Sequence, residues 1–215
     1  IDIEAGLAYI PTQENAFFYA IQEDYKKTGV YKRNPGRWNM GIEMSSLAQN
    51  ILNNLESQPK PGGFLKAFDP LTGETKWSVP IPHYWNGGVL GTEGGLVFQG
   101  DALGMFSAYD KETGERLWEF NTYTSMLAPP ITYEVDGEQY VSILTGSGGG
   151  DMFGGEPLPP IEVQASLKYN NFGRLLVFKL GGKKILPIPN VRDTTIPAQQ
   201  LTQVSIKQMQ NGESN

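Results

Sequence analysis

An eleven-residue pattern that occurs twice constrains the fold of this chain more than any other feature. It begins at Ala67 and again at Ala108, 41 residues later. Both copies read alanine, aromatic, aspartate, two variable residues, threonine, glycine, glutamate, two variable residues and tryptophan. A repeat of about 40 residues is typical of four-stranded propeller blades. The sequence therefore predicts an array of similar β-sheet units.

Each residue type in the repeat has a physical role in a strand-turn-strand unit. Aspartate and threonine hydrogen-bond to backbone groups in tight turns, and glycine supplies a positive φ. We therefore expect Asp69 and Asp110 to cap turns rather than to act as general bases. Trp77 and Trp118 are predicted to pack on a neighbouring blade, with the indole N–H bonded to a carbonyl. As a buried aromatic, Trp118 is expected to cost about 3–5 kcal/mol when replaced by alanine.

Residues Gly87 to Trp118 contain one complete predicted blade. Four strand-sized apolar runs alternate there with glycine-rich or charged turns, and their β-branched and aromatic residues suit a pleated sheet. The runs are Val89-Leu90, Leu96 to Gln99, Met105 to Tyr109 and Leu117 to Phe120.

Incomplete blades are predicted on both sides of it. Ile3 to Thr12 is expected to form one strand, ended by Pro11, and Gly63 to Pro80 to supply two more. Thr132 to Val141 is predicted to form a hairpin, because it contains an Asp-Gly turn, and Arg174 to Leu180 a third strand. No fourth strand with a tryptophan follows. The sequence thus predicts about two and a half four-stranded antiparallel blades.

Two segments depart from the repeat. Residues 13–62 form a polar insertion with a predicted short helix from about Gly41 to Leu55, whose apolar residues fall at helical spacing. This insertion is either a surface excursion or the lining of a funnel or partner surface. Residues 183–215 are expected to form a linker or C-terminal tail, weakly helical near Ala198 to Gln210.

Composition excludes several classes of function. The chain has 215 residues, a net charge of −6 and no cysteine. Disulfides and thiolate metal sites are therefore excluded, and the charge argues against nucleic acid as a partner. His83 is the single histidine, so a multi-histidine metal site is excluded too, and we expect a hydrogen-bonded loop histidine. No apolar run is long enough to span a membrane.

The repeated pattern resembles the tryptophan-docking motif of quinoprotein alcohol dehydrogenases, eight-bladed propellers that carry pyrroloquinoline quinone (PQQ) and Ca²⁺. Residues 85–110, 128–150 and 173–182 also look like the last third of that family, in the same order. The resemblance covers about residues 3–12 and 63–187. It implies an all-β, incomplete propeller over residues 1–182, with the insertion at 13–62, forming the C-terminal portion of an eight-bladed ring.

The resemblance also implies where a cofactor would be contacted. Relatives use a tryptophan or asparagine at the positions of Trp85 and Asn86 to contact the carboxylate edge of PQQ. Gly149 and Gly150 would lie beside the quinone, and Phe153 would form an aromatic wall of the alcohol pocket. A phosphate-loop interpretation of this glycine-rich stretch fails because no helix is predicted to follow it. No catalytic residue or metal ligand is assigned, since the catalytic Asp and the Ca²⁺ ligands are expected upstream of Ile1.

The leading hypothesis is the C-terminal segment of a PQQ- and Ca²⁺-dependent dehydrogenase. Such an enzyme oxidises an alcohol by hydride transfer to the quinone and passes electrons to a cytochrome c or a fused cytochrome domain. The resemblance implies a periplasmic location. The segment alone is expected to be inactive, and its unpaired strand edges to be disordered or to form a homo-oligomer where the rest of the propeller is missing. The alternative is a non-catalytic propeller scaffold that binds other proteins.

Overall fold

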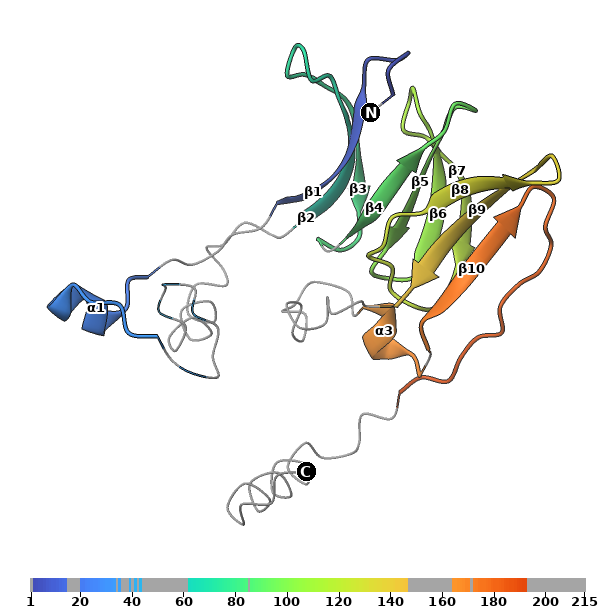
Figure 1. Ribbon diagram of the computed structural model, residues 1–215. Helices are drawn as coiled ribbons and strands as arrows, with labels where there is room; N and C mark the ends of the chain where they lie inside the picture. The colour runs from blue at the N-terminus through green and yellow to red at the C-terminus, as the bar shows by residue number, and fades with distance from the viewer. Residues whose placement is uncertain are drawn as a thin grey trace.

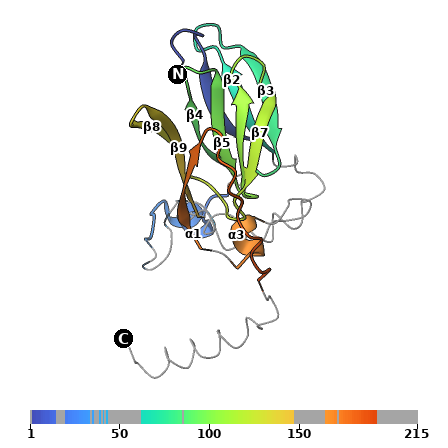
Figure 2. The same cartoon turned by 90° about the vertical axis from the view of Figure 1, so that its right-hand side faces the viewer.

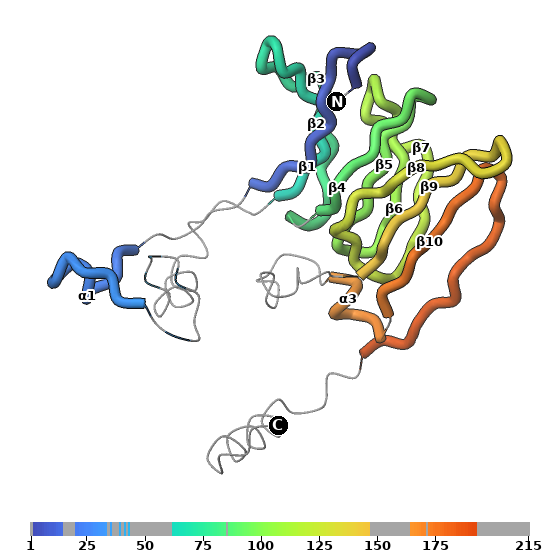
Figure 3. The backbone as a smooth tube through the Cα atoms, viewed as in Figure 1, coloured from blue at the N-terminus to red at the C-terminus, as the bar shows by residue number. Residues whose placement is uncertain are grey.

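The computed structural model describes residues 2–14, 20–33, 35, 39, 41, 43, 62–84, 86–146, 164–170 and 172–192. Three antiparallel sheets lie side by side like the blades of a fan (Figure 1), and the tube in Figure 3 shows how the chain passes from each to the next. Their strand orders are β1-β2-β3, β4-β5-β6-β7 and β10-β9-β8. We call them blades 1, 2 and 3. The predicted fold, an incomplete propeller, is confirmed.

The strands of blade 1 are β1 (Ala8–Glu14), β2 (Gly62–Phe68) and β3 (Thr75–Ile81). Those of blade 2 are β4 (Asn86–Gly91), β5 (Leu96–Asp101), β6 (Met105–Asp110) and β7 (Arg116–Asn121). Those of blade 3 are β8 (Ile131–Val135), β9 (Glu138–Thr145) and β10 (Arg174–Lys179). Blade 2 contains the four predicted strands in the predicted order.

The first strand was predicted with the wrong limits. Residues 3–6 form a turn closed by a bridge between Asp2 and Leu7, and β1 continues through Pro11 to Glu14. Pro11 does not end the strand. Among the described strands, β1 is at the edge of its sheet and pairs with β2 alone. An edge strand tolerates proline, since only alternate N–H groups of such a strand bond to a neighbour.

The hairpin of blade 3 follows the sequence-based expectation. Asp136 and Gly137 have φ values of 53° and 77°, the two positive angles that a type I′ turn requires. Apart from the strands, the described residues include two short helices, α1 (Glu23–Thr28) and α3 (Ala165–Lys168). Neither helix is long and apolar enough to cross a membrane. The helices predicted at 41–55 and 198–210 lie outside the described residues, apart from isolated positions.

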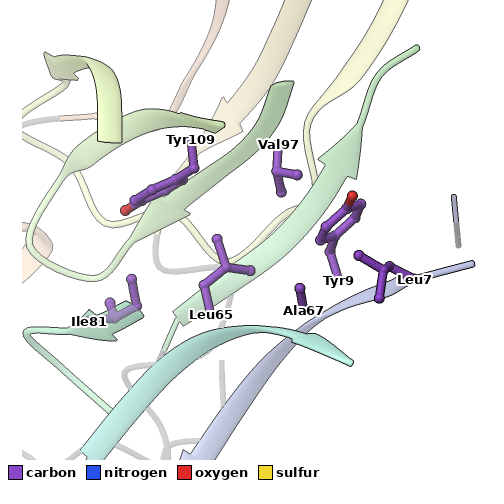
Figure 4. Packing of buried hydrophobic residues seen from close by; sticks show 7 residues of the cluster. All are labelled: Leu7, Tyr9, Leu65, Ala67, Ile81, Val97 and Tyr109. Atoms are coloured by element: carbon purple, nitrogen blue, oxygen red, sulfur yellow. The ribbon is translucent and has the colours of Figure 1, made fainter. Parts of the chain in front are cut away.

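Blades 1 and 2 share an apolar core. Side chains from β1, β2, β3, β5 and β6 meet between the two sheets (Figure 4). The cluster consists of Leu7, Tyr9, Leu65, Ala67, Ile81, Val97 and Tyr109. Alternate residues of each strand face this seam, as the period of two in a β-strand requires. Burial of this apolar area is the main force that holds one blade against the next.

Trp77 fixes how blade 1 meets the turn of blade 2. Its Nε1 donates a hydrogen bond to the carbonyl oxygen of Lys111 at 3.0 Å, and the Tyr9 hydroxyl donates to the same oxygen at 3.3 Å. The indole covers Gly114, where a Cβ would lie 2.7 Å from the Trp77 ring. The predicted docking of a tryptophan on the neighbouring blade is therefore present at this seam.

The turns before both tryptophans are built alike, as predicted. Asp69 Oδ1 accepts from the backbone N–H groups of Leu71 and Thr72. Asp110 Oδ1 accepts from those of Glu112 and Thr113. These donors hold the pKa of both carboxyl groups below its usual value. Carboxylates of this kind are poor proton acceptors, which agrees with a turn-capping role.

Trp118 is less buried than the sequence predicted. It packs on aromatic rings of blades 2 and 3, with Phe178 at 5.5 Å and Phe106 at 5.8 Å between ring centroids, yet 39% of the residue is exposed. The seam partner β10 is the last strand of blade 3, so the sheet covers only part of the indole. The cost of 3–5 kcal/mol expected for a fully buried ring is therefore too high for Trp118→Ala.

Blade 3 has an exposed apolar face on the side away from blade 2. Figure 2 views the molecule from the side of this sheet. The exposed residues are Ile131, Tyr133, Val135, Leu144, Leu175 and Val177. An apolar face of this kind is typical of a surface that another structural unit covers.

A pair of glycine substitutions tests the docking. Gly114 and Gly73 occupy the same place in the two repeats, with φ values of 74° and 78°, but a Cβ at Gly73 would meet no atom within 4 Å. Both alanine variants carry the same backbone strain, and Gly114→Ala must also displace Trp77. We expect Gly114→Ala to lower the free energy of unfolding by about 1–3 kcal/mol more than Gly73→Ala, measured by chemical denaturation. Equal losses would contradict the docking.

Candidate functional site

Only one of the five predicted site residues is among the described residues. Trp85, Gly149, Gly150 and Phe153 lie outside them, so their predicted roles stay predictions. Asn86 is described, at the first position of β4. The structure therefore shows the surroundings of Asn86 directly. For the other predicted site residues, it shows only the described residues that flank them in the sequence.

Asn86 stands where β4 meets the end of β1. It pairs with Asp101 across β4 and β5, and its Nδ2 donates a hydrogen bond to the carbonyl oxygen of Thr12 at 3.1 Å. The side chain is half-buried. An amide nitrogen carries two N–H groups, and Thr12 takes one of them. The carboxamide is thus held in place by blade 1. Among the described residues, no partner is recorded for its second N–H or for its oxygen.

The two glycines after Asn86 serve packing within the protein. In the structure, a Cβ at Gly87 would lie 2.6 Å from the carbonyl oxygen of Gly100, and one at Gly88 would lie 2.8 Å from Pro129. These glycines are needed because β4 approaches its neighbours so closely, whatever binds at the corner.

Met126 brings two predicted parts of the site together. Its carbonyl oxygen would lie 3.0 Å from a Cβ at Gly87, and Met126 forms a parallel bridge with Gly146 on its other side. Gly146 is the first glycine of the glycine-rich stretch. Residues that are far apart in sequence therefore meet at one end of the sheets, the lower end in Figure 1, where α3 also lies.

Gln99 is a buried polar residue that sequence analysis did not single out. It is 1% exposed, and its Nε2 donates to the carbonyl oxygen of Gly87 at 3.0 Å. Within the described part of the chain, its Oε1 has no hydrogen-bond partner. The signal available in the sequence was a glutamine at the end of the otherwise apolar run Leu96 to Gln99. Such a position predicts a buried carboxamide, and buried polar groups usually form hydrogen bonds.

His83 is buried and packed, and the hydrogen bond expected of it stays a prediction. The residue is 2% exposed, and its ring stacks on Tyr84 at 4.8 Å between centroids. In the ranges that the structure describes, no three histidine, aspartate or glutamate side chains come together as a metal site.

A cleft of about 300 Å³ lies at the other end of the sheets. Its lining includes Tyr9, Thr92 and an ion pair between Lys111 Nζ and Asp2 Oδ2 at 3.1 Å. The backbone N–H of Ala5, followed by the hydrogen bond from Lys111, lowers the pKa of Asp2, and the Asp2 carboxylate raises the pKa of Lys111. This cleft joins the docking turn of blade 2 to the N-terminal turn, and it is separate from the Asn86 corner.

Asp101 is the residue of β5 that pairs with Asn86. Its Oδ1 accepts from the Met105 N–H at 2.8 Å, and its carbonyl oxygen accepts from the Met126 N–H at 2.9 Å. Burial raises the pKa of the Asp101 carboxyl from 3.8 to about 6, against the opposing effect of the Met105 N–H. Asp101 therefore stabilises the turn after β5 through its side chain and binds Met126 through its carbonyl oxygen.

The raised pKa predicts a pH dependence of stability. Because the folded pKa of about 6 exceeds the ordinary value of 3.8, the folded chain binds the proton more tightly. The stability that protonated Asp101 contributes is fully present below about pH 4. It is lost as pH rises through about 6, which lowers the free energy of unfolding by about 3 kcal/mol. Relative to the parent, Asp101→Asn should therefore gain stability between pH 4 and 6.5 in urea denaturation. If the stability of Asp101→Asn relative to the parent stays constant or falls as pH rises, the pKa of Asp101 is not raised in the folded protein.

Comparisons with known proteins agree with this geometry. Residues 79–141 match the family model described as glucose/ethanol/alcohol dehydrogenase, β-propeller domain. Quinohemoprotein alcohol dehydrogenase ADH IIB of Pseudomonas putida is 39% identical over 188 residues, 86% of this chain and 24% of that protein. Lupanine 17-hydroxylase [cytochrome c] of a Pseudomonas species is 45% identical over 142 residues, 64% of this chain and 19% of that protein.

Solved structures give the same result. Quinohemoprotein alcohol dehydrogenase ADHIIG of Pseudomonas putida superposes with a TM-score of 0.65 at 29% identity, over 94% of this chain and 30% of that one. The enzyme of Comamonas testosteroni gives 0.61 at 30% identity, over 87% and 26%. The chain thus spans about a quarter of the length of the relatives that it matches. It belongs to the β-propeller family of PQQ-dependent alcohol dehydrogenases.

Proposed function

We propose that this chain is the C-terminal part of a PQQ-dependent dehydrogenase that oxidises alcohols, and that it supplies one edge of the cofactor site. The observation that carries the proposal is the meeting of Gly87, Met126 and Gly146 at one end of the sheets. Two segments to which the family resemblance assigns cofactor contacts begin there, although about 60 residues separate them in the sequence. The same activity is supported by the three quinohemoprotein alcohol dehydrogenases named above.

The chain's own residues have a limited role in this chemistry. When bound, PQQ would accept a hydride from the alcohol, with Ca²⁺ as Lewis acid, and would later release electrons to a cytochrome c. Asn86 would donate its second amide N–H to a carboxylate of the cofactor. The contact with Thr12 fixes the carboxamide before the cofactor arrives, so no rotamer has to be ordered on binding.

The rest of the site would come from other blades. PQQ carries three carboxylates, and a small-molecule site normally buries most of its ligand and neutralises its charge. A carboxamide neutralises none, so cationic and Ca²⁺-binding groups must come from elsewhere in the protein. The exposed apolar face of blade 3 would pack against the next blade of the ring.

A charge substitution at Asn86 tests the proposal in the full-length protein. Asn86→Ala removes a donor, whereas Asn86→Asp also places a negative charge beside the cofactor carboxylates. We expect the PQQ concentration needed for half-maximal reconstitution to rise about fivefold in Asn86→Ala and more in Asn86→Asp. Dye-linked alcohol oxidation during titration with PQQ measures this. Parent-like reconstitution of both variants would remove Asn86 from the site.

Two controls separate binding from folding. Gln139→Glu adds the same charge on β9, near the β8–β9 turn at the opposite end of the sheet, and should leave reconstitution unchanged. Because both variants lose the hydrogen bond to Thr12, circular dichroism should show that each is folded at the assay temperature, so that the loss lies in cofactor binding. The 215-residue chain alone should bind PQQ weakly or not at all, and micromolar binding in calorimetry would contradict a site shared between blades.

A further inference from the structure

We propose that Gln99 is a positioning residue for the cofactor edge, because it holds the stretch of backbone that directs the side chain of Asn86. The inference rests on the proposed function, in which Asn86 binds a carboxylate of PQQ. Gln99 is buried and touches neither cofactor nor substrate itself. It acts through the carbonyl oxygen of Gly87, the residue next to Asn86.

Strand β4 contains a β-bulge directly after Asn86. The register is given by the pairs on either side of the bulge, Asn86 with Asp101 and Val89 with Gln99. Between those pairs, Gly87 and Gly88 lie opposite Gly100 alone. A bulge disrupts the ladder of backbone hydrogen bonds and changes the direction of the side chains beside it, and bulges are frequent next to active sites. The direction of the Asn86 side chain therefore depends on what holds the bulge.

The side chain of Gln99 bonds directly to the bulge. Its Nε2 donates to the carbonyl oxygen of Gly87 at 3.0 Å, which ties the bulge to β5. The N–H of Gly88 donates to the carbonyl oxygen of Leu127 at 3.3 Å, in the loop before β8. The Asn86 carboxamide is held separately, by Thr12 of blade 1. Blade 2 thus fixes the backbone beside Asn86, and blade 1 fixes its side chain.

A purely structural role does not explain a glutamine at this position. Gln99 follows Val97 by two residues on β5, so its side chain lies on the face that packs into the apolar cluster between blades 1 and 2. It is 1% exposed, and in the part of the chain that the structure describes its Oε1 has no hydrogen-bond partner. An unpaired buried acceptor lowers stability. Residues that break a packing rule in this way are expected at functional sites.

A methionine at position 99 separates positioning from stability. Methionine is about as long as glutamine and packs well in irregular apolar surroundings, but it has no N–H to donate. Gln99→Met removes the unpaired oxygen together with the donor to Gly87, so the gain and the loss in stability largely cancel. We expect its melting temperature to lie within about 3 °C of the parent value.

Ser107→Ala is a matched control. Ser107 pairs with Gln99 across β5 and β6 and is 2% exposed. This variant therefore removes a buried polar group directly beside Gln99 and keeps the bond from Gln99 to Gly87.

The experiment has two arms, both in the full-length protein. Without PQQ, amide hydrogen exchange at Gly88 should become about fivefold faster in Gln99→Met and stay at the parent rate in Ser107→Ala. Calorimetric titration with PQQ should give a dissociation constant raised about fivefold in Gln99→Met and unchanged in Ser107→Ala. At saturating PQQ, kcat of Gln99→Met should stay within about twofold of the parent value.

A double-mutant cycle tests whether Gln99 acts through Asn86. In Asn86→Ala the carboxamide that Gln99 positions is gone. Adding Gln99→Met should then raise the dissociation constant for PQQ by less than about twofold further. Independent fivefold losses would multiply to about 25-fold, and that result would overturn the positioning role.

The outcomes separate this inference from the proposed function. Parent-like PQQ binding by Asn86→Ala overturns the role proposed for Asn86, and this inference with it. If Asn86→Ala binds PQQ more weakly, parent-like binding by Gln99→Met overturns the positioning role alone, and so does unchanged exchange at Gly88. A clear fall in the melting temperature of Gln99→Met, or an equal loss of PQQ affinity in Ser107→Ala, would indicate a merely structural residue and would also overturn it.

Discussion

The docking of Trp77 on the turn of the next blade is the contact on which the rest of the structure depends. One carbonyl oxygen, that of Lys111, accepts from Trp77 and from Tyr9, and the indole closes over a glycine that no other residue could replace without a clash. The apolar cluster between blades 1 and 2 supplies most of the favourable free energy. The docking adds direction, because hydrogen bonds fix the angle at which the sheets meet.

That angle places the ends of the strands where a site can form. With blade 1 fixed against blade 2, the end of β1 reaches Asn86 and orients its carboxamide through Thr12. At the same end, Met126 lies between Gly87 and Gly146, and Ser125 links Gly146 to helix α3. The opposite end contains the docking turns. In our account one end of each sheet serves assembly and the other serves chemistry, as is common where loops carry function on a rigid scaffold.

The sequence predicted best what local chemistry determines. The eleven-residue repeat contains its own turn residues. The capping by Asp69 and Asp110, and the strands on either side of each turn, could therefore be predicted from the repeat alone. The Asp-Gly hairpin was equally local. Pro11 was misjudged because its effect depends on whether a second strand lies beside β1, and the exposure of Trp118 depends on how far β10 extends over it. Both depend on contacts between distant residues.

Long-range polar contacts could not be predicted at all. Nothing in the residues around Ser125 indicates a partner at Ser166, and the raised pKa of Asp101 results from burial that only the folded chain creates. The need for glycine at 87 and 88 could not be predicted either, because it results from the close approach of Gly100 and Pro129 in the folded chain. Of the predicted site, the structure describes Asn86 and the residues that flank segment 147–163, Gly146 and Gln164.

The most direct test of this account is the structure of the full-length protein determined with PQQ bound. We expect the cofactor at the end of the sheets where Asn86 lies, with the Asn86 Nδ2 within hydrogen-bond distance of a PQQ carboxylate oxygen and the Thr12 contact retained. PQQ bound at the opposite end, beside the cleft of Asp2 and Lys111, would contradict the account, and so would a PQQ site to which this chain contributes no residue.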